Sequence, residues 1–158
     1  MAKGSAAVLL IDAGNTRVKF AYYERLSAAG VDEVPAATVR FILTHAEIEG
    51  LAAKLKQFAT KPSLVIGVNV SGPLSAARIR EQLDAHCGEQ AYELHWLASE
   101  PQLLHLRNAY AEYQQLGSDR WLAMLGLSVH EAAQKRPAML ISFGTATTID
   151  TVFQDQFL

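Results

Sequence analysis

Cysteine is nearly absent from this sequence, because Cys87 is the only one among 158 residues. A lone cysteine cannot form an internal disulfide, which excludes the disulfide framework of small secreted proteins. The N-terminal segment also lacks the charged start and apolar centre of a secretory signal peptide. We therefore expect a protein of the reducing cytoplasm.

Long apolar runs and blocks of basic residues are missing as well. The apolar run 6–11 is too short to cross a bilayer, and Asp12 ends it. The 14 Lys and Arg residues are interspersed with 16 Asp and Glu residues, so the formal net charge is −2. Since no basic block is present to neutralise the phosphates of a nucleic acid, we expect no nucleic-acid partner. Since the apolar run is too short, we also expect no membrane span.

Hydrophobic residues make up 50% of the sequence, enough for the core of one ordinary domain or of two small ones. Apolar and alternating runs predict strands at 8–11, 17–23, 39–43, 64–70, 92–97, 139–141 and 147–152. A helix is predicted after the capping-box pair Thr44 and Glu47. A second begins at Pro73 and ends at Gly88, and a third follows Ser118 as its cap and runs over 119–134. The opening β-meander and the later alternation of strands and helices predict an α/β fold with a mixed sheet.

An internal echo links segments 10–15 and 140–145. Each has a buried strand, a short polar residue, a spacer, a glycine and a small polar residue, and a β-rich stretch follows each. A single match of this kind also arises by chance, so the echo alone leaves duplication open. If the duplication is real, the first domain covers 1–97 and a second copy begins near Ala138.

The first candidate site surrounds Gly14, in the turn between the first two predicted strands. Gly14 lets backbone approach a phosphate, Asn15 and Thr16 offer donors, and Lys19 offers a cation. Asp12 suits Mg²⁺, which prefers carboxylate, water and phosphate oxygens. The alternative is a plain hairpin turn, for which Asp-x-Gly-Asn is also typical. The usual phosphate loops, Walker A and Gly-x-Gly-x-x-Gly, are absent from the sequence.

The second candidate site is the start of the third predicted helix, at 117–120. Free amides in a first helical turn favour an anion such as a carboxylate, and Arg120 adds a bidentate partner. The helix dipole favours an ionised Asp119, which then suits the late proton transfer of phosphoryl transfer. The alternative is a capped helix with a favourable aspartate in its first turn.

The third candidate site, 144–150, combines Gly144 with a threonine run that could hold a second phosphate edge. A β-rich run into a hairpin explains it equally well. Asp150 at its end is either a metal ligand or a turn or edge residue, and we favour the latter.

The histidines show no metal-ligand spacing and are interpreted as surface or packing residues: His45, His86, His95, His105 and His130. Trp121 is interpreted as a core residue.

Together the three segments resemble the signature set of the type III pantothenate kinase family, also named after the Bvg accessory factor. Segment 12–19 reads DAGNTRVK and resembles the family's phosphate-binding Asp-x-Gly-Asn-Thr-x-x-Lys. Segment 108–121 reads NAYAEYQQLGSDRW and resembles its Asn-x-Tyr…Leu-Gly-x-Asp-Arg-Trp pattern. Segment 143–150 reads FGTATTID and resembles its second phosphate segment. The order and spacing also agree over essentially the whole chain.

The resemblance implies an actin-like (ribonuclease H-like) duplicated fold of the acetate and sugar kinase, Hsp70 and actin superfamily. It implies a homodimer that transfers the γ-phosphoryl group of ATP, with Mg²⁺, to pantothenate in the first step of coenzyme A synthesis. It places a catalytic base at Asp119 and pantothenate at Tyr110, Gly117, Ser118, Asp119 and Arg120. Asp12 would meet Mg²⁺ through ATP. The implied ATP-binding residues are Asp12, Ala13, Gly14, Asn15, Thr16, Arg17, Val18, Lys19 and Thr145.

Two departures from the family pattern qualify these expectations. Ser142 stands where many members have an aspartate linked to a monovalent cation, K⁺ or NH₄⁺, so a cation requirement stays open. Members also continue well past the equivalent of Leu158. We accordingly interpret 98–137 as a helical substrate-binding connection and 138–158 as the first strands of an incomplete second domain. We expect little kinase activity from the 158 residues alone.

Two other functions remain to be weighed against the kinase. A non-catalytic regulatory or binding module could use the same fold, because fold does not determine function. The presence of Asp12, Lys19, Asp119 and Arg120 favours the kinase, whereas an incomplete second domain favours the module. A sugar or acetate kinase relative is the third hypothesis, and the Gly-Ser-Asp-Arg segment with Tyr110 argues against it.

Overall fold

The computed structural model describes residues 6–26, 36–129, 136–144, 146–153 and 156–157. These residues divide into two compact units, the first ending at Leu97 and the second beginning at Ala98. Each unit has its own sheet and its own buried apolar cluster. In the part of the chain that the structure describes, no helix is long and apolar enough to cross a membrane.

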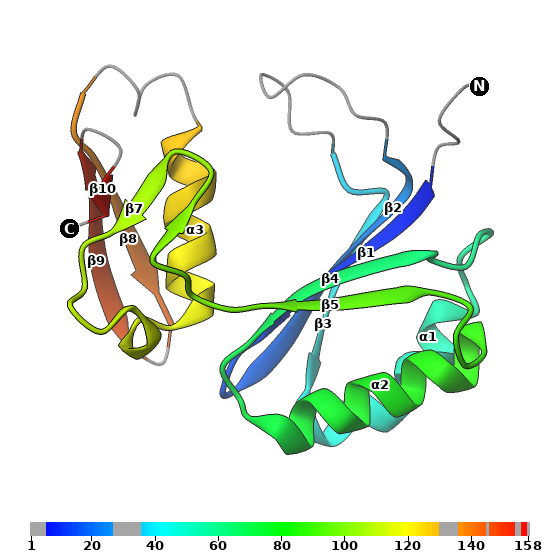
Figure 1. Cartoon of the computed structure of the whole chain (residues 1–158). Coiled ribbons are helices and arrows are strands. Elements are labelled where there is room, and N and C mark those ends of the chain that lie inside the picture. Colours follow the sequence, from blue (N-terminus) through cyan, green and yellow to red (C-terminus); the bar gives the residue numbers. More distant parts are fainter. Residues whose placement is uncertain (1–5, 27–35, 130–135, 145, 154–155, 158) are drawn as a thin grey trace. The chain divides into compact units, whose positions relative to one another are not determined.

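The first unit is built on a five-stranded mixed sheet with the order β3-β2-β1-β4-β5. The first three strands form an antiparallel meander, and β4 and β5 run parallel to β1 (Figure 1). Every strand predicted in this region is confirmed, with small shifts of the ends. The strands are β1 (Ala6–Ala13), β2 (Arg17–Leu26), β3 (Val39–Thr44), β4 (Leu64–Asn69) and β5 (Glu93–Leu97).

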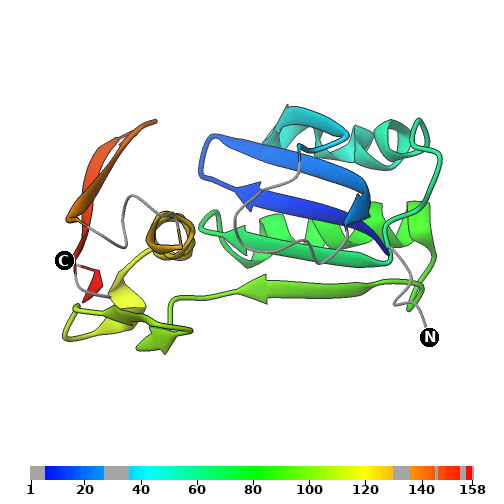
Figure 2. The same cartoon turned by 90° about the horizontal axis from the view of Figure 1, so that it is seen from above.

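One face of this sheet carries the core of the unit. Leu9 and Ile11 of β1 lie beside Phe20 of β2, and all three are almost fully buried. The helical segments η1 (His45–Gly50), α1 (Leu51–Leu55) and α2 (Pro73–Cys87) lie on that face (Figure 2). Among the described residues of this unit, no helix covers the opposite face. Asp12 and Lys19 belong to that opposite face, because side chains alternate along a strand.

The predicted helix boundaries of the first unit are mostly confirmed. Thr44 and Glu47 form the capping box, with the Thr44 N–H and hydroxyl each 2.8 Å from Glu47 Oε2. The helix that follows begins as a 3₁₀ segment and becomes α-helical only from Leu51 to Leu55, so it is shorter and tighter than predicted. Helix α2 ends at Gly88, whose φ of +98° belongs to the region that favours glycine.

The second unit has a five-stranded sheet with the order β6-β7-β10-β9-β8. Its strands β8, β9 and β10 form an antiparallel meander, and β10 runs parallel to β7. Helix α3 packs on this sheet around buried Leu106, Leu116, Trp121, Met124 and Val152. The elements are β6 (Gln102–Leu103), β7 (Leu106–Asn108), η2 (Tyr113–Gln115), α3 (Ser118–Ser128), β8 (Ala138–Phe143), β9 (Thr147–Phe153) and β10 (Gln156–Phe157).

Several expectations for the second unit change. Ser118 is the first helical residue, and Gly117 is the N-cap, so the predicted serine cap is wrong. Helix α3 ends at Ser128, and the rest of the predicted helix, 130–134, lies outside the described residues. Segment 98–137, expected to be helical, also carries the short strands β6 and β7. These strands are too short to produce a readable alternation of apolar residues, which is why the sequence did not predict them.

Candidate functional site

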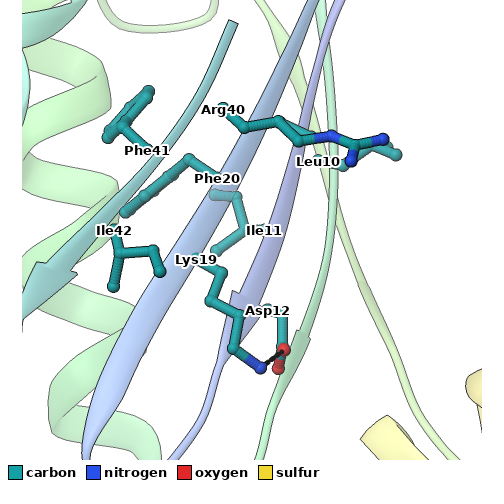
Figure 3. Close-up of a pocket in the computed structure, with 9 residues that line it drawn as sticks. Leu10, Ile11, Asp12, Lys19, Phe20, Arg40, Phe41 and Ile42 are labelled. Atoms are coloured by element: carbon teal, nitrogen blue, oxygen red, sulfur yellow. Dashed lines mark hydrogen bonds and ion pairs between the residues drawn. The ribbon is translucent and has the colours of Figure 1, made fainter. Parts of the chain in front are cut away.

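The candidate nucleotide-binding segment is the turn between β1 and β2. Asp12 and Lys19 are directly opposite each other on these two strands, and Lys19 Nζ lies 2.8 Å from Asp12 Oδ2 (Figure 3). The Lys19 side chain is 62% exposed and the Asp12 side chain is 38% exposed. An exposed pair of this kind contributes little to stability, so a ligand can replace it at small cost. The structure thus brings a cation and a carboxylate together beside the turn.

The turn itself is closed by a backbone hydrogen bond from Gly14 N to Arg17 O, at 3.1 Å. A Cβ at Gly14 would lie 3.3 Å from that same oxygen, so the turn leaves little room for a side chain there. The side chains of Asn15, Thr16 and Arg17 are exposed, whereas Val18 is fully buried. The turn therefore presents its polar side chains to solvent while its flanking residues anchor it.

His45 ties this turn to the helices of the first unit. Its Nε2 lies 2.8 Å from Gly14 O, and because a carbonyl oxygen only accepts, Nε2 is the donor. Its Nδ1 lies 3.5 Å from Oγ of Ser75, a buried residue of α2. The sequence suggested a surface or packing role for His45. No local signal could have revealed the contact, because 31 residues separate it from Gly14.

Asn69, at the end of β4, lies at the same end of the sheet as the turn between β1 and β2. It pairs in register with Ala13, since β1 and β4 are parallel, and Val70 N donates to Ala13 O at 3.0 Å. Its side chain donates to Gly72 O and accepts from both N–H and hydroxyl of Ser71. In open α/β sheets ligands bind beyond the carboxyl ends of parallel strands, which is where Asn69 lies. Sequence reasoning missed Asn69, although a polar residue at the end of the predicted strand 64–70 was a usable signal.

An open hollow of about 390 Å³ lies on the sheet face that carries Asp12 and Lys19. Its walls come from β1, β2 and β3 (Figure 3). Leu10 and Ile42 supply apolar surface, and Arg40 adds a second cation to the lining, at the end of the hollow near Leu10 (Figure 3). The face can thus receive a group that is partly apolar and partly anionic.

The candidate substrate segment lies in the second unit, at the start of α3. Trp121 N donates to Gly117 O at 3.0 Å, which closes the first helical turn. The Asp119 carboxylate accepts from the backbone N–H of Arg120 at 2.8 Å, and its side chain is partly exposed. The structure confirms that both residues lie in the first turn of a helix, where backbone amides and the helix dipole favour negative charge.

The Arg120 side chain makes a charged contact that the sequence did not predict. Its Nε lies 3.1 and 3.2 Å from the two carboxylate oxygens of Asp150, and its Nη2 also donates to Asp150 Oδ1. Hydrogen bonding to Asp150 raises the pKa of the Arg120 guanidinium, with a smaller contribution from the Tyr110 side chain, although burial opposes the shift. The interpretation of Asp150 as a turn or edge residue is wrong: it lies within β9, between β8 and β10, and is 1% exposed.

The third segment forms the turn between β8 and β9. Gly144 N donates to Ala146 O at 3.2 Å, and Ser142 is an exposed residue of β8. Thr145 lies outside the described residues. Within the described parts of both units, no three His, Cys, Asp or Glu side chains gather as a metal cluster. Among the described histidines, His86 is buried and His95 exposed.

Comparison with known proteins points to the same family that the three candidate segments resemble. A family model described as type III pantothenate kinase matches residues 8–158. The chain belongs to this family. A type III pantothenate kinase of Bordetella petrii is 40% identical over 148 residues, and the match covers 94% of this chain and 52% of that protein. The type III pantothenate kinase of Herminiimonas arsenicoxydans is 37% identical over 150 residues, covering 94% of this chain and 54% of that protein.

A third type III pantothenate kinase, from Aromatoleum aromaticum, is 36% identical over 155 residues. It is matched over 92% of this chain and 53% of its own length. The chain therefore spans about half the length of the curated relatives that it matches.

Proposed function

We propose that the protein is a kinase that transfers the γ-phosphoryl group of ATP to pantothenate, the first step of coenzyme A biosynthesis. Membership of the type III pantothenate kinase family supports the substrate. The observation that carries the proposal is the placement of Asp119 and Arg120 in the first turn of α3. The Tyr110 side chain lies close enough to Arg120 to raise the pKa of its guanidinium. This arrangement combines a proton acceptor with donors for an anionic substrate.

The nucleotide half of the proposed reaction uses the turn 12–19. When bound, ATP supplies the phosphoryl group, and Mg²⁺ neutralises its phosphates. Asp12 fits an Mg²⁺ held through ATP, because Mg²⁺ is commonly bound by one or two carboxylates together with phosphates rather than by a protein cage. Lys19 is free to turn from Asp12 toward phosphate oxygens, since their pairing is exposed. The remaining proposed ATP contacts are Ala13, Gly14, Asn15, Thr16, Arg17, Val18 and Thr145.

The substrate half uses the start of α3. Arg120 donates hydrogen bonds to pantothenate together with first-turn amides, while Tyr110, Gly117 and Ser118 line the substrate. Asp119 accepts the proton of the attacking hydroxyl group. Since phosphoryl transfer depends mainly on positioning and charge neutralisation, the carboxylate needs only to receive that proton late.

We further propose an actin-like, ribonuclease H-like duplicated fold for the complete protein. The meander β1-β2-β3 and the meander β8-β9-β10 both begin with a strand, a glycine turn and an antiparallel partner, which supports the echo found in the sequence. The division into 1–97, 98–137 and 138–158 stays a prediction, as do a homodimer and a cytoplasmic location. Ser142 offers no charge for K⁺ or NH₄⁺, so a requirement for a monovalent cation stays open.

The test is ADP release by the protein in the length that the cell makes, with pantothenate as acceptor. We expect pantothenate-dependent ADP release and formation of 4′-phosphopantothenate, identified by mass spectrometry. The matched control is pantothenate lacking the 4′-hydroxyl, which should release no ADP above background. Absence of any pantothenate-dependent product would refute the proposed function.

A further inference from the structure

The buried carboxylate of Asp150 has no role in the proposed reaction as described above. It is 1% exposed, whereas its partner Arg120 has a side chain that is 31% exposed. Asp150 lies on the face of β9 that also carries Val152, a member of the buried apolar cluster of the second unit. One end of the ion pair is thus enclosed by the core, and the other end reaches solvent.

A structural role alone explains this pair poorly. Removing a carboxylate from water is costly, and well-packed apolar side chains often replace a buried ion pair without loss of stability. Position 150 faces the same side of the sheet as the apolar residues Leu140 and Val152. An apolar residue at that position would suit the core at least as well, so the carboxylate requires another reason.

The geometry of the pair supplies one. Asp150 engages the Nε and Nη2 edge of the guanidinium, and both of its oxygens take part. A planar guanidinium held along one edge cannot rotate, so its remaining N–H donors point in a defined direction. The exposed fraction of the Arg120 side chain leaves those donors accessible, and the Tyr110 side chain lies close enough to act on the same group.

We propose that Asp150 is a positioning residue, which holds the guanidinium of Arg120 so that its outward N–H groups meet the polar groups of pantothenate. This inference rests on the proposed function. Because the two charges cancel, Arg120 recognises its ligand by the direction of its hydrogen bonds more than by net attraction. Asp150 touches no substrate and acts only through Arg120.

The first test is Asp150→Asn in the protein of natural length. Asparagine keeps the size and one acceptor oxygen but loses the charge and the second acceptor. We expect the KM for pantothenate to rise on the order of 10-fold or more, as for loss of a hydrogen bond to a charged group. The KM for ATP and the kcat at saturating pantothenate should change much less. A purely structural residue would instead lower the active fraction and leave both KM values in place.

The matched control is Glu49→Gln. Glu49 accepts from Nε and Nη2 of Arg78, the same two donors, but this pair lies on the surface of the first unit. The control removes an equivalent carboxylate from an equivalent arginine and should leave both KM values unchanged. An equal rise in the pantothenate KM in both variants would overturn the proposal, because it would show a general effect of charge.

A thermodynamic cycle tests whether Asp150 acts through Arg120. In the background of Arg120→Lys, which cannot offer a planar two-donor edge, Asp150→Asn should raise the pantothenate KM by less than twofold further. Full additivity would overturn the proposal. If Asp150→Asn does not fold, Asp150→Glu is the second variant. It keeps the charge but displaces the guanidinium, so a KM equal to that of the unmodified protein would also contradict the inference.

The orientation can be measured without turnover. The Nε–H of Arg120, observed by ¹⁵N NMR, should exchange slowly with water in the unmodified protein and quickly in Asp150→Asn. Fast exchange in the unmodified protein would overturn the inference.

Should the unmodified protein fail to phosphorylate pantothenate, the proposed function and the pantothenate part of this inference would both fall. Activity without the KM shift would overturn this inference alone.

Discussion

Adjacent residues at the start of α3 are held in different ways. The Asp119 carboxylate accepts from the neighbouring backbone N–H of Arg120, a contact within its own helical turn. The Arg120 side chain is instead fixed by Asp150, which lies 30 residues further along the chain. A local contact of this kind leaves Asp119 able to change partner when a hydroxyl group arrives, whereas Arg120 stays where β9 holds it.

This difference yields a prediction for Asp119→Asn. The change keeps the shape of the side chain and an acceptor for the Arg120 N–H, but it removes the proton acceptor. We expect kcat to fall by about 10²–10⁴-fold, the usual contribution of a general base. Stability should change by about 1 kcal/mol or less, the size of a first-turn charge effect. Steady-state kinetics and thermal unfolding measured on the same preparation check both numbers.

Ser118→Ala is the control for Asp119, because it changes the neighbouring side chain without touching the carboxylate. The N-cap is Gly117, and a serine hydroxyl that lines the substrate should contribute to the pantothenate KM rather than accept the proton. We therefore expect a change in kcat far smaller than that of Asp119→Asn. An unaltered kcat in Asp119→Asn would remove this residue from the mechanism and leave the pantothenate assignment resting on family membership.

At the residue scale, the sequence pointed to candidate groups that share one segment and missed the contacts that are made through space. The turn 12–19 and the pair Asp119 and Arg120 are contiguous, so their spacing carried the signal. His45 and Asp150 contact these segments across 31 and 30 residues, respectively. Contacts of that range depend on how strands and helices pack, and a single sequence carries no direct record of them.

Among the elements, β4 shows how a single glycine makes room for a large side chain on the neighbouring strand. A Cβ placed on Gly67 would lie 2.5 Å from Trp96 Cζ3 and 3.1 Å from Ile11 Cβ. The Trp96 ring on β5 therefore lies over Gly67, and both face the core side of the sheet with Ile11. The ring fills the space that a side chain on β4 would otherwise occupy.

We predict that Gly67→Ala destabilises the first unit. The added methyl group forces Trp96 or the strand to move, and overpacking of this kind costs about 1–3 kcal/mol. Denaturant unfolding followed by tryptophan fluorescence measures the loss. Gly50→Ala is the control, because nothing lies within 4 Å of its added Cβ and its φ of −87° suits alanine. That variant should be neutral or stabilised by up to about 1 kcal/mol, and equal losses in both would contradict the packing argument.

The elements themselves were predictable where the local pattern was strong. The buried run of β1 and the proline and glycine that bound α2 needed no tertiary information. The strand pair β6 and β7 turns at Leu104, which has a φ of +54° although it is not glycine. No sequence rule would place a leucine in such a turn, because this backbone region disfavours it. The sheet of the second unit, rather than local preference, imposes that conformation.

On the scale of the whole molecule, the two units differ in how well each closes its own core. Among the described residues, the cluster of the first unit contains fourteen buried side chains, whereas that of the second contains five. The second unit also exposes apolar residues on the face of β8 and β9 that α3 does not cover. These are Met139, Ile141, Phe143, Ile149 and Phe153, with exposed fractions from 40% to 84%. Burial of apolar surface is the main stabilising term in folding, so the first unit should be the more stable.

We therefore predict that a fragment of residues 1–97 folds alone and that a fragment of residues 98–158 does not. The first fragment keeps its five-stranded sheet, its helices and its complete cluster, so it should unfold cooperatively with a free energy of a few kcal/mol. The second keeps α3 and its sheet but has little buried apolar area with which to offset the entropy of ordering the chain. Circular dichroism during urea titration distinguishes the two outcomes. A cooperative transition in 98–158 without one in 1–97 would reverse the order of stability derived from the two cores.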